Sequence, residues 1–263
     1  MRHGVFLALL LTATALVAGW LARGVRRGGF DRDRFPTPAR RGLAISLLAA
    51  VLLVSVVLPF AGGLAGRTLE PGRFSPVSAF AIHAIFALFL VSYYLLSGRP
   101  PVADFLRLRT RRPWRLAAAG FPIAAFAWAA AVAVMLAVQG LISVFGPSGA
   151  ASPKISPIVP WIVGLPVAYK IAIVVSAMIF EEAFFRAFLQ PRLGPVAATL
   201  LFTMAHGIYG QPVLLVGIAV LSTVLALAFE LYGNALPGIV AHGAFDAFEI
   251  FVLIPFALRF VGI

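Results

Sequence analysis

Cysteine is absent from this sequence of 263 residues, and only 11% of the residues are charged. Without cysteine the chain has no disulfide bond, no thiolate metal ligand and no cysteine nucleophile. The scarcity of charge excludes an ordinary soluble domain, because such domains are about 25% charged and about 45–50% apolar. Here 62% of the residues are hydrophobic. The composition therefore indicates a protein that lies in a membrane.

Apolar runs of about 20 residues recur along the chain, which is the length that an α-helix needs to cross about 30 Å of hydrocarbon. The alternating ten-residue segments of an outer-membrane barrel are missing. We therefore predict an all-α polytopic membrane protein, a bundle of about eight transmembrane helices with a polar intramembrane cavity. The expected spans are residues 4–22, 43–64, 77–96, 116–145, 161–190, 195–206, 212–232 and 235–259.

The charges that are present are mostly positive, with a formal net charge of +12, and they lie in short loops between the apolar runs. Two loops are rich in arginine: the first holds Arg23, Arg26, Arg27, Arg32, Arg34, Arg40 and Arg41, and the second holds Arg99, Arg107, Arg109, Arg111, Arg112 and Arg115. The positive residues of the intervening loops are Arg67, Arg73 and Lys154. Because positive loops mark the cytoplasmic side, we predict a protein of the bacterial inner (cell) membrane with both termini outside. The arginines would contact membrane lipids, and we expect no nucleic-acid partner.

Two adjacent carboxylates and an arginine lie inside one apolar run, at Glu181, Glu182 and Arg186. An ion in hydrocarbon costs about 3 kcal/mol on insertion scales, so these residues are functional candidates. Glu182 and Arg186 share a helix face and can form a salt bridge, whereas Glu181 points about 100° away with no partner on its own helix. The alternative is a structural ion pair with a spare glutamate that reaches the membrane interface.

Three further titratable residues, His206, His242 and Asp246, lie on later runs. At 1.5 Å per residue, Glu181, His206 and His242 lie about 13, 18 and 12 Å from the nearest expected cytoplasmic turn, so we expect them to converge. Phe202 and His206 share a helix face, as do His242 and Asp246. The small residues beside both histidines leave room for a substrate backbone or for close helix packing. A purely structural polar cluster is the alternative.

These residue types suit hydrolysis by general acid–base catalysis, in which a carboxylate activates water and histidines donate protons or stabilise an oxyanion. Asp246 could fix the tautomer of His242. The sequence has neither the Gly-x-Ser-x-Gly turn of a serine hydrolase nor the His-Glu-x-x-His helix of a zinc protease. We expect no cofactor; a zinc ion held by Glu181, His206 and His242 is the chemically feasible alternative.

The same residues resemble the three motifs of the CPBP family of intramembrane endopeptidases, the CAAX-prenyl-protease and bacteriocin-processing group also called Abi. The family motifs are Glu-Glu-x-x-x-Arg, Phe-x-x-x-His and His-x-x-x-Asn/Asp. The sequence has Glu181-Glu182-Ala-Phe-Phe-Arg186, Phe202-Thr-Met-Ala-His206 and His242-Gly-Ala-Phe-Asp246, in this order. The resemblance covers about residues 171–251, and the ordered triple is far more specific than one motif alone.

The resemblance implies a glutamate-dependent intramembrane protease, with zinc as the second option, and a conical cavity open to the cytoplasm. Glu181 would activate water with the help of His206, and His242 with Asp246 would stabilise the oxyanion. The expected catalytic residues are Glu181, His206, His242 and Asp246, and the supporting residues are Glu182, Arg186 and Phe202. The substrate would be a membrane-associated or lipidated protein or peptide.

We predict two parts of the chain: residues 1–160, with about four spans and the Arg-rich loops, and residues 161–263, a catalytic transmembrane core with the three motifs. His83 lies in the first part with no carboxylate at helical spacing, and we assign it no function. Two functions of other classes remain as alternatives: a non-catalytic immunity or scaffold protein, and a proton-coupled transporter that uses the buried acids and histidines as a relay.

Overall fold

The computed structural model describes residues 2–31, 33–66, 75–146 and 156–261, and every regular element in these ranges is a helix. The helices of the first part are α1 (Arg2–Arg26), α2 (Pro38–Leu52), η1 (Leu53–Val57), α3 (Leu58–Leu64), η3 (Pro76–Phe80), α4 (Ala81–Leu96), α5 (Val102–Phe105) and α6 (Pro113–Phe145). Those of the second part are α7 (Ile158–Gly164), α8 (Val167–Glu181), η4 (Glu182–Leu189), α9 (Gln190–Leu193), α10 (Pro195–Ala205), η5 (His206–Tyr209), α11 (Pro212–Tyr232), α12 (Leu236–Phe248), η6 (Glu249–Leu253) and α13 (Ile254–Val261). Of the loop residues used to predict sidedness, Arg32, Arg67, Arg73 and Lys154 lie outside the described ranges.

Six helices of the described chain are long and apolar enough to cross a membrane. They are His3–Arg26, Pro38–Leu64, Pro76–Leu96, Pro113–Phe145, Pro212–Tyr232 and Leu236–Arg259. The prediction of an all-α polytopic membrane protein is therefore confirmed, and six of the expected spans have their counterparts here.

The remaining two expected spans differ from the prediction, so the number of about eight is not confirmed. The expected span 161–190 is not one straight helix, because the chain bends by 119° between Ile158–Gly164 and Val167–Leu193. Pro166 explains the bend, since a proline forces the residue before it, Leu165, into an extended conformation (ψ 151°). The expected span 195–206 belongs to the shorter apolar helix Pro195–Tyr209. Its rise of about 22 Å is less than the hydrocarbon thickness.

The two Arg-rich loops and two later turns meet at one end of the molecule. Asp33 of the first loop pairs with Arg192, in the turn before α10, at 2.6 Å. Arg107 of the second loop accepts a hydrogen bond from the backbone N–H of Ala235 (2.9 Å), at the start of α12. The side-chain amide of Asn234 donates to the carbonyl of Arg109 (3.2 Å). Each Arg-rich loop therefore contacts one of the two later turns that were expected on the same face of the membrane.

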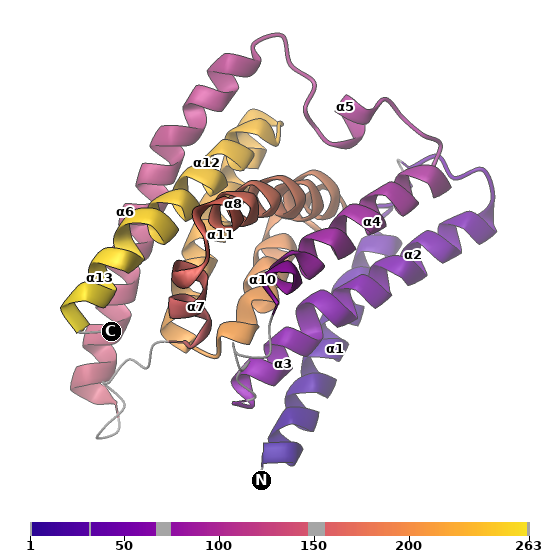
Figure 1. Ribbon diagram of the computed structural model, residues 1–263. Coiled ribbons are helices and arrows are strands. Elements are labelled where there is room, and N and C mark those ends of the chain that lie inside the picture. The colour runs from indigo at the N-terminus through magenta and orange to yellow at the C-terminus, as the bar shows by residue number, and fades with distance from the viewer. Residues whose placement is uncertain (1, 32, 67–74, 147–155, 262–263) are drawn as a thin grey trace.

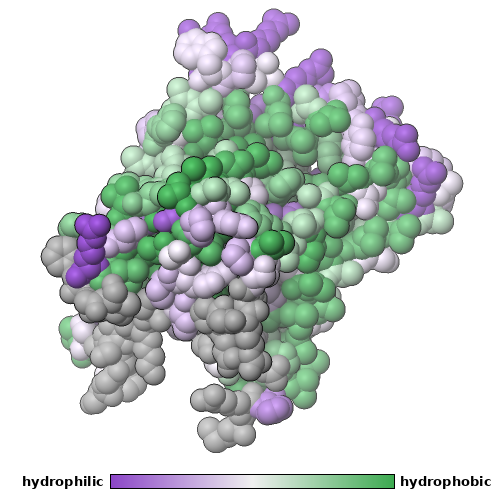
Figure 2. All heavy atoms as spheres, viewed as in Figure 1, coloured by the Kyte–Doolittle hydropathy of each residue, from purple (hydrophilic) through white to green (hydrophobic). Residues whose placement is uncertain are grey.

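The hydropathy of the surface also differs between the end with the Arg-rich loops and the middle of the molecule. Figure 1 shows α5 at one end of the molecule, with the start of α1 and the end of α13 directed away from it. In Figure 2, hydrophobic residues cover the middle of the visible face, and hydrophilic residues gather at the end where α5 and the start of α6 lie. This pattern fits a protein whose middle contacts lipid. Which end faces the cytoplasm stays a prediction.

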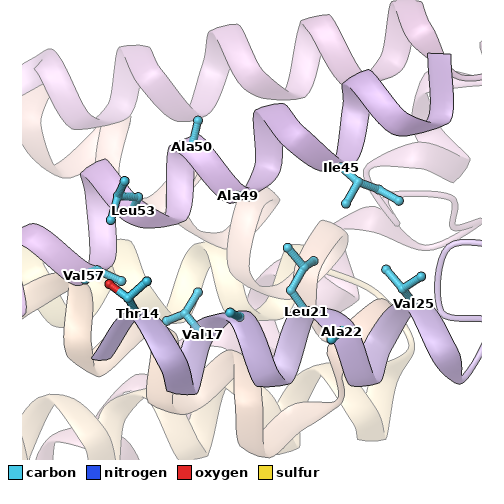
Figure 3. Close-up of a pocket in the computed structure, with 11 residues that line it drawn as sticks. Thr14, Val17, Leu21, Ala22, Val25, Ile45, Ala49, Ala50, Leu53 and Val57 are labelled. Carbon is cyan, nitrogen blue, oxygen red and sulfur yellow. The ribbon is translucent and has the colours of Figure 1, made fainter. Parts of the chain in front are cut away.

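An apolar crevice of about 600 Å³ separates α1 from α2 and η1. Val17, Leu21 and Val25 line it from α1, and Ile45 and Leu53 line it from the facing helix (Figure 3). Thr14 also lies in the lining, but its hydroxyl donates to the carbonyl of Leu10 within the helix (2.7 Å). The crevice therefore offers an apolar surface and no titratable group, and its lining contains none of the motif residues.

Candidate active site

The helix that carries both glutamates is held by a cluster of phenylalanines. α8 continues into η4, a π-helical stretch of eight residues that are all buried. Phe184 of η4 stacks on Phe86 of α4 with ring centroids 4.3 Å apart, and Phe188 packs edge-on against Phe89 at 5.1 Å. Such aromatic pairs add stability beyond their buried area. Short π-helical stretches are frequent at functional sites, and this one begins at Glu182.

Glu182 and Arg186 form the predicted ion pair, and both side chains are completely buried. The Arg186 Nε atom lies 3.5 Å from Glu182 Oε2. Its Nη2 atom donates to the hydroxyl of Ser222 on α11 (3.1 Å), and its guanidinium lies over the ring of Phe202 on α10, 4.8 Å from the centroid. Arg186 therefore connects η4 to two other helices, which gives it and Phe202 a structural part in the site.

His242 joins this ion pair, which the sequence analysis did not anticipate. Its Nδ1 atom lies 3.1 Å from Glu182 Oε1, and its Nε2 atom lies 3.4 Å from Asp246 Oδ2. The contact with Asp246 is the predicted one. An ionised carboxylate only accepts hydrogen bonds, so His242 satisfies both acids at once only with a proton on each ring nitrogen. Glu182 thus has one oxygen directed to a histidine and the other to an arginine.

Glu181 faces His206, as the depth estimate predicts. The Glu181 Oε2 atom lies 3.7 Å from His206 Nε2, and the glutamate side chain is only 9% exposed. The Nδ1 atom of His206 lies 2.8 Å from the carbonyl oxygen of Phe202. A carbonyl only accepts, so the proton of a neutral His206 is on Nδ1 and the lone pair of Nε2 faces the glutamate. Glu181 Oε2 has no hydrogen-bond partner within the described part of the chain.

Glu181 also has a partner that sequence reasoning missed. His83 of α4 places its Nε2 atom 3.2 Å from Glu181 Oε1, and its Nδ1 atom lies 2.8 Å from the hydroxyl of Ser176. His83 is separated from Glu181 by 98 positions. A single histidine in an apolar run was the only signal, and no spacing rule connects two residues on different helices. The partner of Glu181 is therefore visible only in the tertiary structure.

The small residues beside the histidines serve close helix packing, one of the two expected alternatives. A Cβ atom on Gly207, next to His206, would lie 2.5 Å from the Cα atom of Phe60 in α3. A Cβ atom on Gly243, next to His242, would collide with the sulfur of Met178. On α12, a Cβ atom at Gly238 would lie 2.8 Å from Glu182 Oε2. Glycine at these positions lets η5 pack against α3, and it lets α12 pack against α8 and the Glu182 carboxylate.

The expected zinc ligands are not arranged as one set. Glu181 contacts His206 and His83, whereas both ring nitrogens of His242 face Glu182 and Asp246. Among the residues that the structure describes, no three His, Asp or Glu side chains form a group that could hold a metal ion. We therefore derive no step through a metal, and the metal requirement stays open to experiment.

The helices and these contacts describe a polytopic helical membrane protein with a cluster of two glutamates, an aspartate and three histidines, of which only His206 and Asp246 are partly exposed. Such a cluster can take a proton from water, donate a proton and stabilise negative charge. The family model of the type II CAAX prenyl endopeptidases, Rce1-like, matches residues 163–248. No curated protein and no solved structure gives a match.

The family match covers all seven motif residues and about a third of the chain. It confirms the resemblance that the three motifs predicted, and it supports a membrane protease of the CPBP type. His83 lies outside the matched segment. The predicted division of the chain at residue 160 stays a prediction, although His83 shows that the first part contributes to the cluster in the second.

Proposed function

We propose that this protein is an intramembrane endopeptidase that hydrolyses a peptide bond in a membrane-associated, lipidated protein or peptide. The observation that carries the proposal is the pair formed by Glu181 Oε2 and His206 Nε2. These two atoms face each other at 3.7 Å, and neither carries a proton when the carboxylate is ionised and the imidazole is neutral. One water molecule can donate a hydrogen to each of them, which orients its lone pairs away from both.

In this proposal Glu181 takes a proton from that water as it attacks the peptide carbonyl, and His206 holds the water in place. The negative charge that develops on the carbonyl oxygen needs a nearby donor. His242 would supply it with the Nε2–H that lies 3.4 Å from Asp246, shared between that carboxylate and the oxyanion. Asp246 only accepts while it is ionised, and it would keep the imidazole protonated and oriented. Glu182 and Arg186 hold His242 in position. The proton taken by Glu181 then goes to the leaving amine, so the hydrolysis balances.

The family match points to prenylated substrates, because its name refers to prenyl endopeptidases of CAAX sequences. A suitable probe is a quenched fluorescent peptide that ends in farnesyl-cysteine followed by three residues. We expect the purified chain in liposomes to cleave it, and Glu181→Gln to abolish cleavage while the protein still folds. Glu230→Gln is a matched control, since Glu230 accepts a hydrogen bond from Gln190 (2.8 Å), which lies outside the three motifs.

The same probe without the farnesyl group tests the substrate class. In parallel, mass spectrometry of membranes from cells with the wild-type protein or Glu181→Gln would reveal natural substrates. If neither the probes nor the membranes yield a product that depends on Glu181, the proposal is wrong. Glu181-dependent proton flux in liposomes without cleavage would instead support a proton-coupled transporter, and a cellular phenotype that survives Glu181→Gln would support a non-catalytic protein.

A further inference from the structure

We infer that His83, together with Ser176, is a positioning device for Glu181, which restricts the glutamate to one rotamer and leaves one of its oxygens for water. The effect on catalysis rests on the proposed function, whereas the positioning of Glu181 by His83 does not depend on it. It assigns a role in the site to a helix, α4, that lies outside the segment matched by the family model.

The two oxygens of Glu181 have different surroundings. Oε1 lies 3.2 Å from His83 Nε2, within hydrogen-bond distance, whereas Oε2 has no hydrogen-bond partner within the described residues and faces His206 at 3.7 Å. A carboxylate that is held through one oxygen cannot turn freely about its last bond. The contact with His83 therefore decides which oxygen is directed to His206.

The proton on His83 Nε2 follows from its neighbours. An ionised Glu181 only accepts hydrogen bonds, so Nε2 carries the hydrogen of this contact. At the other side of the ring, the Ser176 hydroxyl lies 2.8 Å from Nδ1 and 3.0 Å from the carbonyl of Ile173. If the hydroxyl donates to Nδ1, the ring is neutral with its hydrogen on Nε2. If the hydroxyl donates to Ile173, both ring nitrogens are protonated.

Both arrangements keep an N–H group directed at Glu181. In the first, the serine hydroxyl also fixes the neutral tautomer that the glutamate needs. The geometry of the helices supports this assignment. Ser176 lies on α8, the helix that ends at Glu181, and His83 is 5% exposed on α4, which packs against α8. One imidazole thus connects two points of the same helix, five positions apart. The ring cannot tilt without loss of a hydrogen bond in an apolar setting, where an unpaired polar group is costly.

The first test is kinetic and uses the farnesylated fluorescent peptide with the full chain in liposomes. His83→Phe keeps a flat ring and removes both hydrogen bonds. We expect kcat to fall about 10-fold or more, as when partners that orient a metal-ligating histidine are removed, with KM changed less than about twofold, because the lost contact acts on the chemical step. His83→Gln places an amide N–H near the position of Nε2 and should recover kcat to within about threefold of wild type.

Two serines provide a matched pair. Ser176→Ala removes the hydroxyl that contacts the imidazole, and we expect a fall in kcat between those of His83→Gln and His83→Phe. Ser55→Ala removes a buried hydroxyl that donates to the carbonyl of Val51 (2.6 Å), and we expect kcat to stay at the wild-type value. If His83→Phe keeps full activity while Glu181→Gln is inactive, the inference is wrong and the proposed function stands. If glutamine at position 83 recovers folding but not kcat, the inference is equally wrong.

The second test does not need an active enzyme. The chain has four histidines, so nitrogen NMR of protein labelled only in histidine gives few ring signals. The signals missing from His83→Gln identify His83. We expect its Nε2 to be protonated, the Nε2 signal to shift in Glu181→Ala, and the Nδ1 signal to shift in Ser176→Ala. An Nε2 signal that ignores Glu181→Ala overturns the inference, whether or not the peptide is cleaved.

Discussion

Asp33 and Arg192 form a two-pronged ion pair across 159 positions of sequence, with Nη2 to Oδ1 at 2.6 Å and Nε to Oδ2 at 2.9 Å. Tyr93 donates its hydroxyl to the same aspartate (2.7 Å), and the Arg192 guanidinium lies over the ring of Phe188. This pair fastens the first Arg-rich loop to the turn between the first two motifs. It therefore holds in place the C-terminal end of the continuous helical segment α8–η4–α9, which carries Glu181.

We expect Asp33→Asn and Arg192→Ala to lower thermal stability clearly. The two side chains are 14% and 9% exposed, and breaking a buried pair costs about 3–5 kcal/mol because one charge loses its partner. Arg41→Ala is the matched control, from the first turn of α2, which follows that loop. Arg41 and Asp31 are 39% and 62% exposed, and such pairs contribute about 0–1 kcal/mol. Thermal unfolding in detergent measures all three. Equal melting temperatures for Arg192→Ala and Arg41→Ala would contradict this account of the loop.

The orientation in the membrane can be tested with single cysteines, because the chain has none of its own. We expect a cysteine at Ala39, an exposed residue at the start of α2, to be inaccessible to an impermeant thiol reagent applied to whole cells. A cysteine at Ser75, exposed at the opposite end of the next span, should react. The reverse labelling pattern would place the Arg-rich loops outside and would invert the predicted topology.

The two adjacent glutamates should respond differently to substitution. Glu182→Ala leaves Arg186 and His242 without their common acceptor in a fully buried position, so we expect a loss of about 3–5 kcal/mol in stability and lower expression. Arg186→Ala should act in the same direction. Glu181→Gln should fold normally and be inactive, because an amide oxygen can still accept from His83. Expression yield, melting temperature and peptide cleavage together decide; a stable Glu182→Ala with an unstable Glu181→Gln would reverse the assignment.

Gly207 should be essential for the position of His206. A methyl group there meets the backbone of Phe60, and backbone atoms cannot move aside as a side chain can, so α3 and η5 must separate. We expect Gly207→Ala to lower the free energy of unfolding by about 1–3 kcal/mol, as at other overpacked sites. The melting temperature and the rate of cleavage should both fall. Gly62→Ala is the control, because a Cβ atom at Gly62 has nothing within 4 Å. Unchanged cleavage by Gly207→Ala would mean that His206 does not depend on this contact.

Metal dependence is the last prediction. We expect the purified protein to contain no stoichiometric zinc and to keep its activity after thorough chelation, since Glu181 and His206 can bind water without a metal. Activity should fall at low pH as Glu181 becomes protonated and can no longer accept a proton. Elemental analysis and assays with chelator measure this directly. One zinc per chain, together with activity that chelation removes and zinc restores, would make Glu181 a ligand or a base for metal-bound water.

The class of fold and most of the candidate site could be predicted from the order of the amino acids alone. The length of a hydrophobic run can be counted directly in the sequence, and for this reason six of the expected spans are found in the structure. The pairs Glu182–Arg186 and His242–Asp246 follow from helical spacing, because residues four positions apart share a face whatever the rest of the chain does. The residues of each motif lie within one or two helical turns, so their relative positions follow from their spacing in the sequence.

Which helices contact one another could not be predicted in the same way and is visible only in the folded chain. The contacts of Glu182 with His242 and of Glu181 with His83 join helices that are 60 and 98 positions apart, and no periodicity encodes such a distance. Pro166 marks a break in the expected span 161–190, but the bend of 119° is visible only in the structure, since a proline permits a kink without setting its angle. Likewise, only the structure shows why glycine is needed at two positions: Gly207 lies against the backbone of Phe60, and Gly238 lies against the Glu182 carboxylate. The packing of α4 against α8 thus brings His83, which lies outside the matched segment, into contact with Glu181.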